Sequence, residues 1–140
     1  EFDWTGTEDP TPWLVLPEAI ETLESLDPDG VEGVRRANRS LALAAREILS
    51  VSLGATPPCP ASMIGSLAAL SLPGGAEGGG PPDPFRVDPL QRALLKEYRI
   101  EVPVFSWPRP VGRIVRISAQ RYNELGQYRY LAGALRDLLD

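Results

Sequence analysis

"RIEVPVFSWPRPVGRIVRIS", residues 99–118, is the stretch of sequence that decides the fold class of this chain. Its two halves, 99–107 and 111–118, are rich in β-branched and aromatic residues, which favour strands. They are joined by the short turn PRPVG. A parallel crossover takes a dozen residues or more, so the two strands must pair as an antiparallel hairpin. Pro103 lacks a backbone N–H, which favours an edge position for the first strand.

The remaining regular segments add one strand and four helices. Residues 62–73, SMIGSLAALSLP, alternate roughly between apolar and small residues, which predicts a strand. The helices are predicted from apolar residues at helical spacing, over 17–26, over a long segment that follows Asp27 and ends at Gly54, over 88–98, and over 123–140 with Asn123 as cap. The predicted fold is therefore α+β: a small, mainly antiparallel sheet of about three strands with helices packed on one face.

One loop interrupts this pattern. In PGGAEGGGPPDP, residues 73–84, nine of the twelve residues are Gly or Pro. Such a composition offers too little apolar surface to offset the entropy lost on ordering. A flexible surface loop over 74–84, rather than a domain boundary, is expected.

Composition excludes several classes of partner. The net charge of −5 argues against nucleic acid, because binding the phosphate backbone requires a basic face. No apolar run reaches the roughly 18 residues that a membrane helix needs, and no secretory leader is visible. The lone cysteine, Cys59, cannot form an intramolecular disulfide, and the chain has no histidine for a Cys/His zinc site. A cytoplasmic setting, with no membrane contact and no metal, is predicted.

The residue types that usually carry catalysis are scarce as well. Without histidine, Ser-His-Asp and Cys-His arrangements are impossible. Cys59 is flanked by prolines with no cation beside it to lower its pKa, so an incidental thiol is expected. Lys96 is the only lysine and lies within a predicted helix, where a surface position is expected. Residue patterns alone thus predict no catalytic residue.

Arg116 is the one candidate for a binding residue. Strand alternation places it on one face with Ile114 and Ser118, while Arg113 faces the other way. A guanidinium held on a rigid strand can grip a carboxylate through two parallel hydrogen bonds. Spacing alone leaves two interpretations open, a structural ion pair and a clamp for a substrate.

Three blocks of the sequence carry a family resemblance. They are FDWTGTEDPTPWLVLPEAI (2–20) near the start, MIGSLAALSLP (63–73) in the middle, and YRIEVPV (98–104) with VRISAQRYNELGQY (115–128) near the end. In this order they resemble the C-terminal part of class V aminotransferase-like enzymes, and most of all the isopenicillin N epimerase-like branch. The resemblance covers nearly the whole chain. It implies a pyridoxal 5′-phosphate enzyme of fold type I, in which a small C-terminal domain closes over a large cofactor domain.

The resemblance also implies roles for single residues. Gly6 and Thr7 match a loop that reaches the neighbouring protomer of a homodimer, where the threonine hydroxyl binds the cofactor phosphate. Glu8 departs from the basic residue that many relatives carry at this point. Arg116 matches the arginine that holds the substrate's carboxylate, which favours the clamp over the ion pair. Tyr122 and Asn123 match a step that begins the last helix, and a capping role is expected.

Two absences limit what the resemblance implies. The stretch VPVFSWPRPVG, residues 102–112, lacks the nucleophilic cysteine of cysteine desulfurases, so that route is disfavoured and racemisation, elimination or transamination remains open. Phe105 and Trp107 of this stretch are candidates for the pocket wall or for the core. The family's Schiff-base lysine belongs to the large domain, and Lys96 matches no such motif.

The resulting hypothesis assigns residues 1–16 to a loop of the large domain and residues 17–140 to the small domain. The chain would be a fragment that binds no cofactor and is inactive alone, from a homodimer that acts on an amino acid. The alternative is a free-standing, cofactor-free α+β module that binds another protein.

Overall fold

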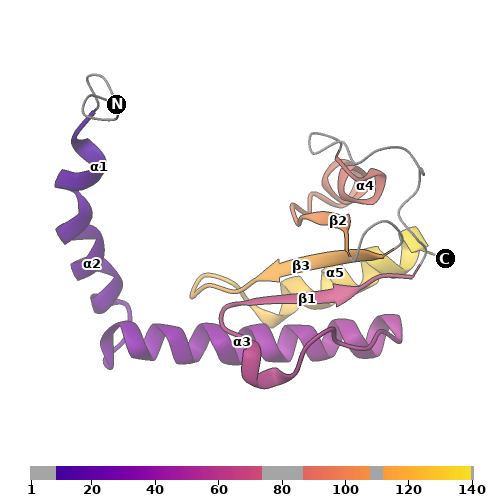
Figure 1. Cartoon of the computed structure of the whole chain (residues 1–140), viewed down its shortest axis with the longest axis horizontal. Coiled ribbons are helices and arrows are strands. Elements are labelled where there is room, and N and C mark those ends of the chain that lie inside the picture. Colours follow the sequence, from indigo (N-terminus) through magenta and orange to yellow (C-terminus); the bar gives the residue numbers. More distant parts are fainter. Residues whose placement is uncertain (1–8, 74–86, 108–111, 140) are drawn as a thin grey trace, which may run out of the picture. The chain divides into compact units, whose positions relative to one another are not determined.

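The computed structural model describes residues 9–73, 87–107 and 112–139. Gly6, Thr7 and the predicted loop over 74–84 lie outside these ranges. Figure 1 shows the elements, which follow in chain order: α1 (Thr11–Leu14), α2 (Leu16–Ser25), α3 (Gly30–Leu53), the 3₁₀ turn η1 (Ala61–Met63), β1 (Leu67–Ser71), α4 (Pro89–Tyr98), β2 (Val104–Ser106), β3 (Arg113–Ser118) and α5 (Leu125–Leu139). The α+β class is confirmed.

The chain divides into two compact units, with the division between Arg36 and Ala37 inside α3. The assignment of residues 1–16 and 17–140 to different domains stays a prediction.

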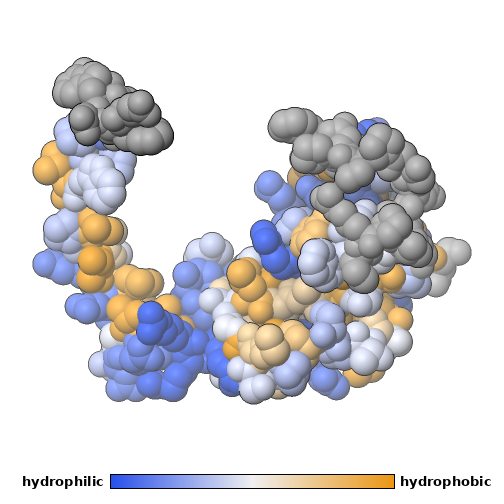
Figure 2. Space-filling model, viewed as in Figure 1, coloured by the Kyte–Doolittle hydropathy of each residue, from blue (hydrophilic) through white to orange (hydrophobic). Residues whose placement is uncertain are grey.

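The N-terminal unit corrects one expectation, because residues 11–14 form the short helix α1 where a loop was predicted. The Asp9 carboxylate accepts hydrogen bonds from the Thr11 backbone N–H at 3.0 Å and from its hydroxyl at 2.6 Å, and Pro12 suits a first-turn position. Neither α1 nor α2 buries a residue. Apolar side chains are therefore exposed along this unit (Figure 2), among them Trp13, Leu14, Val15, Leu16 and Ile20.

The C-terminal unit is built on the predicted hairpin. β3 is the central strand of a three-stranded sheet in the order β1-β3-β2, and both pairings are antiparallel. β2 is short and lies at an edge, as Pro103 indicated. β1 is shorter than predicted, because residues 61–63 form a 3₁₀ turn instead of continuing the strand.

One core holds the helices against the sheet. α3, α4, α5 and all three strands contribute side chains to it, and the fully buried ones of largest volume are Leu49, Leu70, Leu94, Val115, Ile117 and Leu135. Ala42 and Ala45 of α3 are completely buried, which allows this helix to pack closely. Gly54 adopts a positive φ of 60° and follows the end of α3, as its position predicted.

The start of α5 differs in detail from the prediction. Asn123 was expected to cap the helix, but its Oδ1 accepts from the Gln120 backbone N–H at 3.0 Å and so closes the preceding turn. Gln127 makes the capping contact, because its Oε1 accepts from the Glu124 backbone N–H at 3.0 Å. The Asn123 side chain supports this arrangement by donating to the same Oε1 at 3.1 Å.

Candidate functional site

The faces of β3 separate core residues from site residues. Val115 and Ile117 are buried, whereas Arg116 and Ser118 are exposed on the opposite side. Arg116 pairs with Ala69 of β1, so a small side chain stands beside the guanidinium stem. The predicted facing of Arg116 is confirmed, and the strand holds its backbone rigidly through the central position of β3 in the sheet.

The neighbouring arginine on the same strand is a structural residue. Arg113 donates through Nε to the Asp88 Oδ2 at 3.0 Å and through a second nitrogen to Oδ1, which is a bidentate ion pair. Both side chains are only 11% exposed. Arg116, in contrast, has neither an ion pair nor a side-chain hydrogen bond to any part of the chain that the structure describes. Its guanidinium is available to an external carboxylate.

Arg116 borders a pocket of about 440 Å³. The pocket lies beside the part of β3 that has no β2 partner, because β2 pairs only with residues from Arg113 to Val115. Beyond that point the Arg116 N–H donates to the Pro103 carbonyl at 3.1 Å, and residues 99–102 line the pocket instead of continuing the sheet. The shortness of β2 therefore creates the site.

The rest of the lining is polar on one side. Ser118, Tyr122, Asn123 and Gln127 contribute hydroxyl and amide groups from the end of β3, the following turn and α5. Tyr128 donates its hydroxyl to the Ser118 carbonyl at 2.6 Å. Burial, and secondarily the nearby Tyr122 hydroxyl, raise the pKa of Tyr128 above its ordinary value of 10.0. This wall is uncharged at neutral pH.

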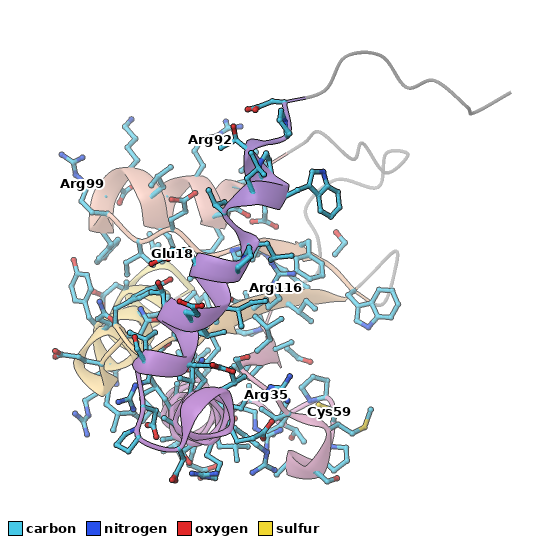
Figure 3. All side chains as sticks on the ribbon, turned by 90° about the vertical axis from the view of Figure 1, so that its left-hand side faces the viewer. Glu18, Arg35, Cys59, Arg92, Arg99 and Arg116 are labelled. Atoms are coloured by element: carbon cyan, nitrogen blue, oxygen red, sulfur yellow. The ribbon has the colours of Figure 1, made fainter. Side chains whose placement is uncertain are left out.

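Charged side chains near the pocket differ in direction. Arg99 lines it with a left-handed backbone at φ 58°, and Glu101 is the acid among the lining residues. Figure 3 shows Arg99 and Arg92 projecting from α4, well apart from Arg116 on the sheet. Arg116 is therefore the arginine that the sheet itself brings to the pocket.

The other residues singled out in the sequence lie elsewhere. Lys96 is exposed on α4, and Cys59 is half-buried, with its carbonyl accepting from Arg46 at 2.9 Å. Neither lines the pocket. Phe105 and Trp107 do not line it either, and are 40% and 61% exposed. The core alternative is thus wrong for these aromatic residues, and a place in the wall of a substrate pocket stays a prediction.

Sequence reasoning missed the polar wall. Tyr122 and Asn123 were expected only to cap a helix, and Gln127 was not singled out. The available signal was their position just after the strand that carries Arg116. That signal is weak, because most residues after a strand simply form a turn.

The described residues also limit other kinds of site. They contain no group of three His, Cys, Asp or Glu placed to hold a metal ion. None of the helices in the described ranges is both long and apolar enough to cross a membrane.

Comparison with known proteins finds relatives that match nearly the whole chain. No protein-family model matches the chain. The chain is 36% identical over 135 residues to an isopenicillin N epimerase of Amycolatopsis lactamdurans, a match that covers 95% of the chain and 30% of the relative. It is 29% identical over 145 residues to a probable chloroplastic L-cysteine desulfhydrase of Arabidopsis thaliana, covering 99% of the chain and 30% of the relative. It is 33% identical over 132 residues to an isopenicillin N epimerase of Streptomyces clavuligerus, covering 93% of the chain and 30% of the relative.

The chain thus spans about 30% of the length of these relatives. These matches fit a C-terminal part of the relatives. The chain is similar to proteins named isopenicillin N epimerase and L-cysteine desulfhydrase, and these relatives fit a C-terminal fragment of a class V aminotransferase-like, pyridoxal-phosphate-dependent enzyme.

Proposed function

We propose that this chain supplies the substrate-carboxylate site of a pyridoxal-phosphate-dependent enzyme that acts on an amino acid. Arg116 is the residue that binds the carboxylate. The observation that carries the proposal is the contrast within β3: Arg113 is neutralised by Asp88, whereas Arg116 lines a pocket without an ionic partner among the described residues.

Physical reasoning supports the choice of Arg116. A planar guanidinium matches a carboxylate with two parallel hydrogen bonds, and such charge-assisted pairs are roughly twice as strong as neutral hydrogen bonds. An exposed, unpaired arginine costs the fold nothing to keep charged. The strand backbone fixes where the stem begins, so less entropy is lost when the ligand binds.

The described residues fit the substrate side of such a site but not the cofactor. Pyridoxal phosphate serves its enzymes as an electron sink and is held through a lysine. Lys96, the only lysine of the chain, is exposed on α4 and does not line the Arg116 pocket. We therefore expect this chain alone to bind no cofactor and to be inactive.

Gly6 and Thr7 remain the proposed cofactor contact. A glycine lets the backbone approach a phosphate closely, and the threonine hydroxyl donates a hydrogen bond to it. In the proposal this contact is made across a homodimer, and the protein is cytoplasmic. The homodimer rests on the family resemblance, and the cytoplasmic setting rests on the single cysteine.

The relatives' names indicate the general type of reaction. One name describes an epimerisation and the other a desulfhydration of L-cysteine. The relatives are enzymes that act on amino acids, and the carboxylate of an amino acid is the group that Arg116 would bind. We propose epimerisation, elimination or transfer of nitrogen as the reaction, with an amino acid as substrate.

The test is Arg116→Ala in the protein as it is encoded. Loss of a hydrogen-bonded charge pair costs about 1.5–3 kcal/mol, so we expect KM for the amino-acid substrate to rise roughly 10- to 150-fold. Arg92→Ala is the matched control, because Arg92 is also an exposed arginine and does not line the pocket. An unchanged KM for Arg116→Ala would remove the residue from the site.

The alternative, a cofactor-free module that binds another protein, has its own test. If the encoded protein contains no cofactor-binding lysine and shows no absorbance of a bound Schiff base, the enzyme proposal fails and the module remains. The relatives support the enzyme, because the match to them extends over 95% or more of the chain in two of the three comparisons described.

A further inference from the structure

A buried amide is the starting point for a second assignment. Asn38 of α3 is 6% exposed and is the buried polar residue of the part that the structure describes. Its Nδ2 donates to the Gln120 Oε1 at 2.9 Å, across 82 residues of sequence. Its Oδ1 is buried and accepts no hydrogen bond from the described residues. An apolar residue at this position would avoid that cost, so the Asn38 contact calls for another explanation.

Gln120 belongs to the turn after β3 and makes further hydrogen bonds within it. Its Oε1 also accepts from the Arg121 backbone N–H at 2.8 Å. Its backbone carbonyl accepts from the Asn123 N–H at 2.8 Å, while its own N–H donates to the Asn123 Oδ1 at 3.0 Å. The turn between Gln120 and Asn123 is thereby tied to α3 on one side and, through Asn123 and Gln127, to α5 on the other.

Tyr122 lies in this turn, and its side chain points outward. It is 80% exposed, although it lines the same pocket as Arg116. No side-chain hydrogen bond holds its hydroxyl among the described residues. The neighbouring tyrosines differ, because the hydroxyls of Tyr128 and Tyr130 donate to the carbonyls of Ser118 and Tyr98.

The chemistry of the pocket indicates which ligand would use this hydroxyl. Arg116 provides one positive charge for a carboxylate, and Arg99 and Glu101 add one charge of each sign on the side lined by residues 99–103. Beside Arg116, Ser118, Tyr122, Asn123 and Gln127 offer neutral donors and acceptors. Such a wall favours a side chain that carries an uncharged polar group over an apolar side chain of the same length.

We propose that Tyr122 is a specificity-determining residue whose hydroxyl binds an uncharged polar group on the side chain of the amino acid held by Arg116. The Asn38–Gln120 hydrogen bond is a positioning contact that holds the Tyr122 turn. This assignment rests on the proposed function of Arg116.

The experiment compares two probes, L-glutamine and L-norleucine, which have similar length and differ in the side-chain amide. Their dissociation constants are measured by isothermal titration calorimetry with the protein as it is encoded. The unaltered protein is expected to bind L-glutamine more tightly. Tyr122→Phe should raise the dissociation constant of L-glutamine about 2- to 10-fold, the range for one neutral hydrogen bond, and leave that of L-norleucine unchanged.

Tyr98→Phe is the matched control, because it makes the same chemical change at a tyrosine that does not line the pocket. Asn38→Leu should reduce the preference for L-glutamine in the same direction, and should add no further loss when Tyr122 is already Phe. A purely structural role of Asn38 would instead weaken both probes alike or add to the Tyr122 effect.

The outcomes separate this assignment from the proposed function. If Arg116→Ala weakens the binding of both probes but Tyr122→Phe changes the binding of neither, the Tyr122 assignment is overturned and the proposed function stands. If Arg116→Ala weakens the binding of neither probe, the proposed function fails. Absence of any preference for L-glutamine in the unaltered protein, or failure of both probes to bind, would also overturn the assignment.

Discussion

Arg113 and Arg116 lie three residues apart on β3 and meet different surroundings. Side chains alternate between the faces of a strand, so two residues three apart point to opposite sides. The inner side brings Arg113 to the Asp88 carboxylate, and the outer side leaves Arg116 beside Ala69. Identical chemistry thus serves stability at one position and, in the proposed function, ligand binding at the other.

Tyr128 provides a prediction about pH. Burial raises its pKa above 10.0, and its hydroxyl donates to the Ser118 carbonyl. The protonated form is favoured by folding, so its contribution is complete below pH 10 and is lost as pH rises through the higher folded-state value. Urea denaturation should show stability declining above about pH 10.

Tyr128→Phe is the comparison for this prediction. The free energy of unfolding of the variant should be about 1 kcal/mol lower at pH 7, the value of one hydrogen bond. Its stability should also decline less steeply at alkaline pH. An equally steep decline in the variant would mean that other groups control the alkaline transition.

At the scale of elements, Asp88 joins α4 to the sheet. Its carboxylate accepts from the Leu90 backbone N–H at 2.8 Å, which caps the helix, and also receives both hydrogen bonds of Arg113. One side chain therefore fixes the start of α4 against β3. Because α4 and its C-terminal end lead directly into residues 99–103, this joint also positions part of the pocket.

Asp88→Ala should lower the free energy of unfolding by about 3–5 kcal/mol, because it leaves a nearly buried guanidinium without its partner. Asp88→Asn should cost less, since asparagine retains the ability to cap the helix. Chemical denaturation gives both values.

Glu32→Ala is the control for Asp88→Ala. The ion pair between Glu32 and Arg35 is about two-thirds exposed on both sides, so its loss should change stability by less than about 0.5 kcal/mol. Equal effects of the two substitutions would contradict the special role given to Asp88.

At the scale of the whole molecule, the two units differ in how they are stabilised. The unit from Ala37 onward contains the hydrophobic core, the sheet and the pocket. α1 and α2 contain no buried residue and expose Trp13, Leu14, Val15 and Leu16. The N-terminal helices therefore add little to the stability of the described chain.

Removal of residues 1–26 tests this point. The midpoint of thermal unfolding should change by less than about 4 °C, as expected for loss of surface residues outside the core. The shortened chain should also associate less at high concentration, because exposed apolar side chains are removed. A fall in the midpoint of more than about 10 °C would show that these helices contribute to the core.

Most of the fold could be predicted because its signals are local. The length of the turn between 107 and 113 requires a hairpin, and periodicities of 2 and 3.6 distinguish β3 from α5. Shorter signals were less reliable: the helix at 11–14 begins with hydrogen bonds from Thr11 to the Asp9 carboxylate, and the start of α5 depends on Gln127 rather than Asn123. Several residues compete for such roles, and sequence does not rank them.

The α+β class, the antiparallel sheet, the family resemblance and the facing of Arg116 could be read from the sequence alone, because each follows from spacing or from short contiguous blocks. Tertiary structure alone decided which arginine is neutralised, where the pocket opens and that Tyr122 lies in it. These features depend on Asp88 meeting Arg113 and on Asn38 meeting Gln120. Such pairs are distant in the chain, so only packing brings them together.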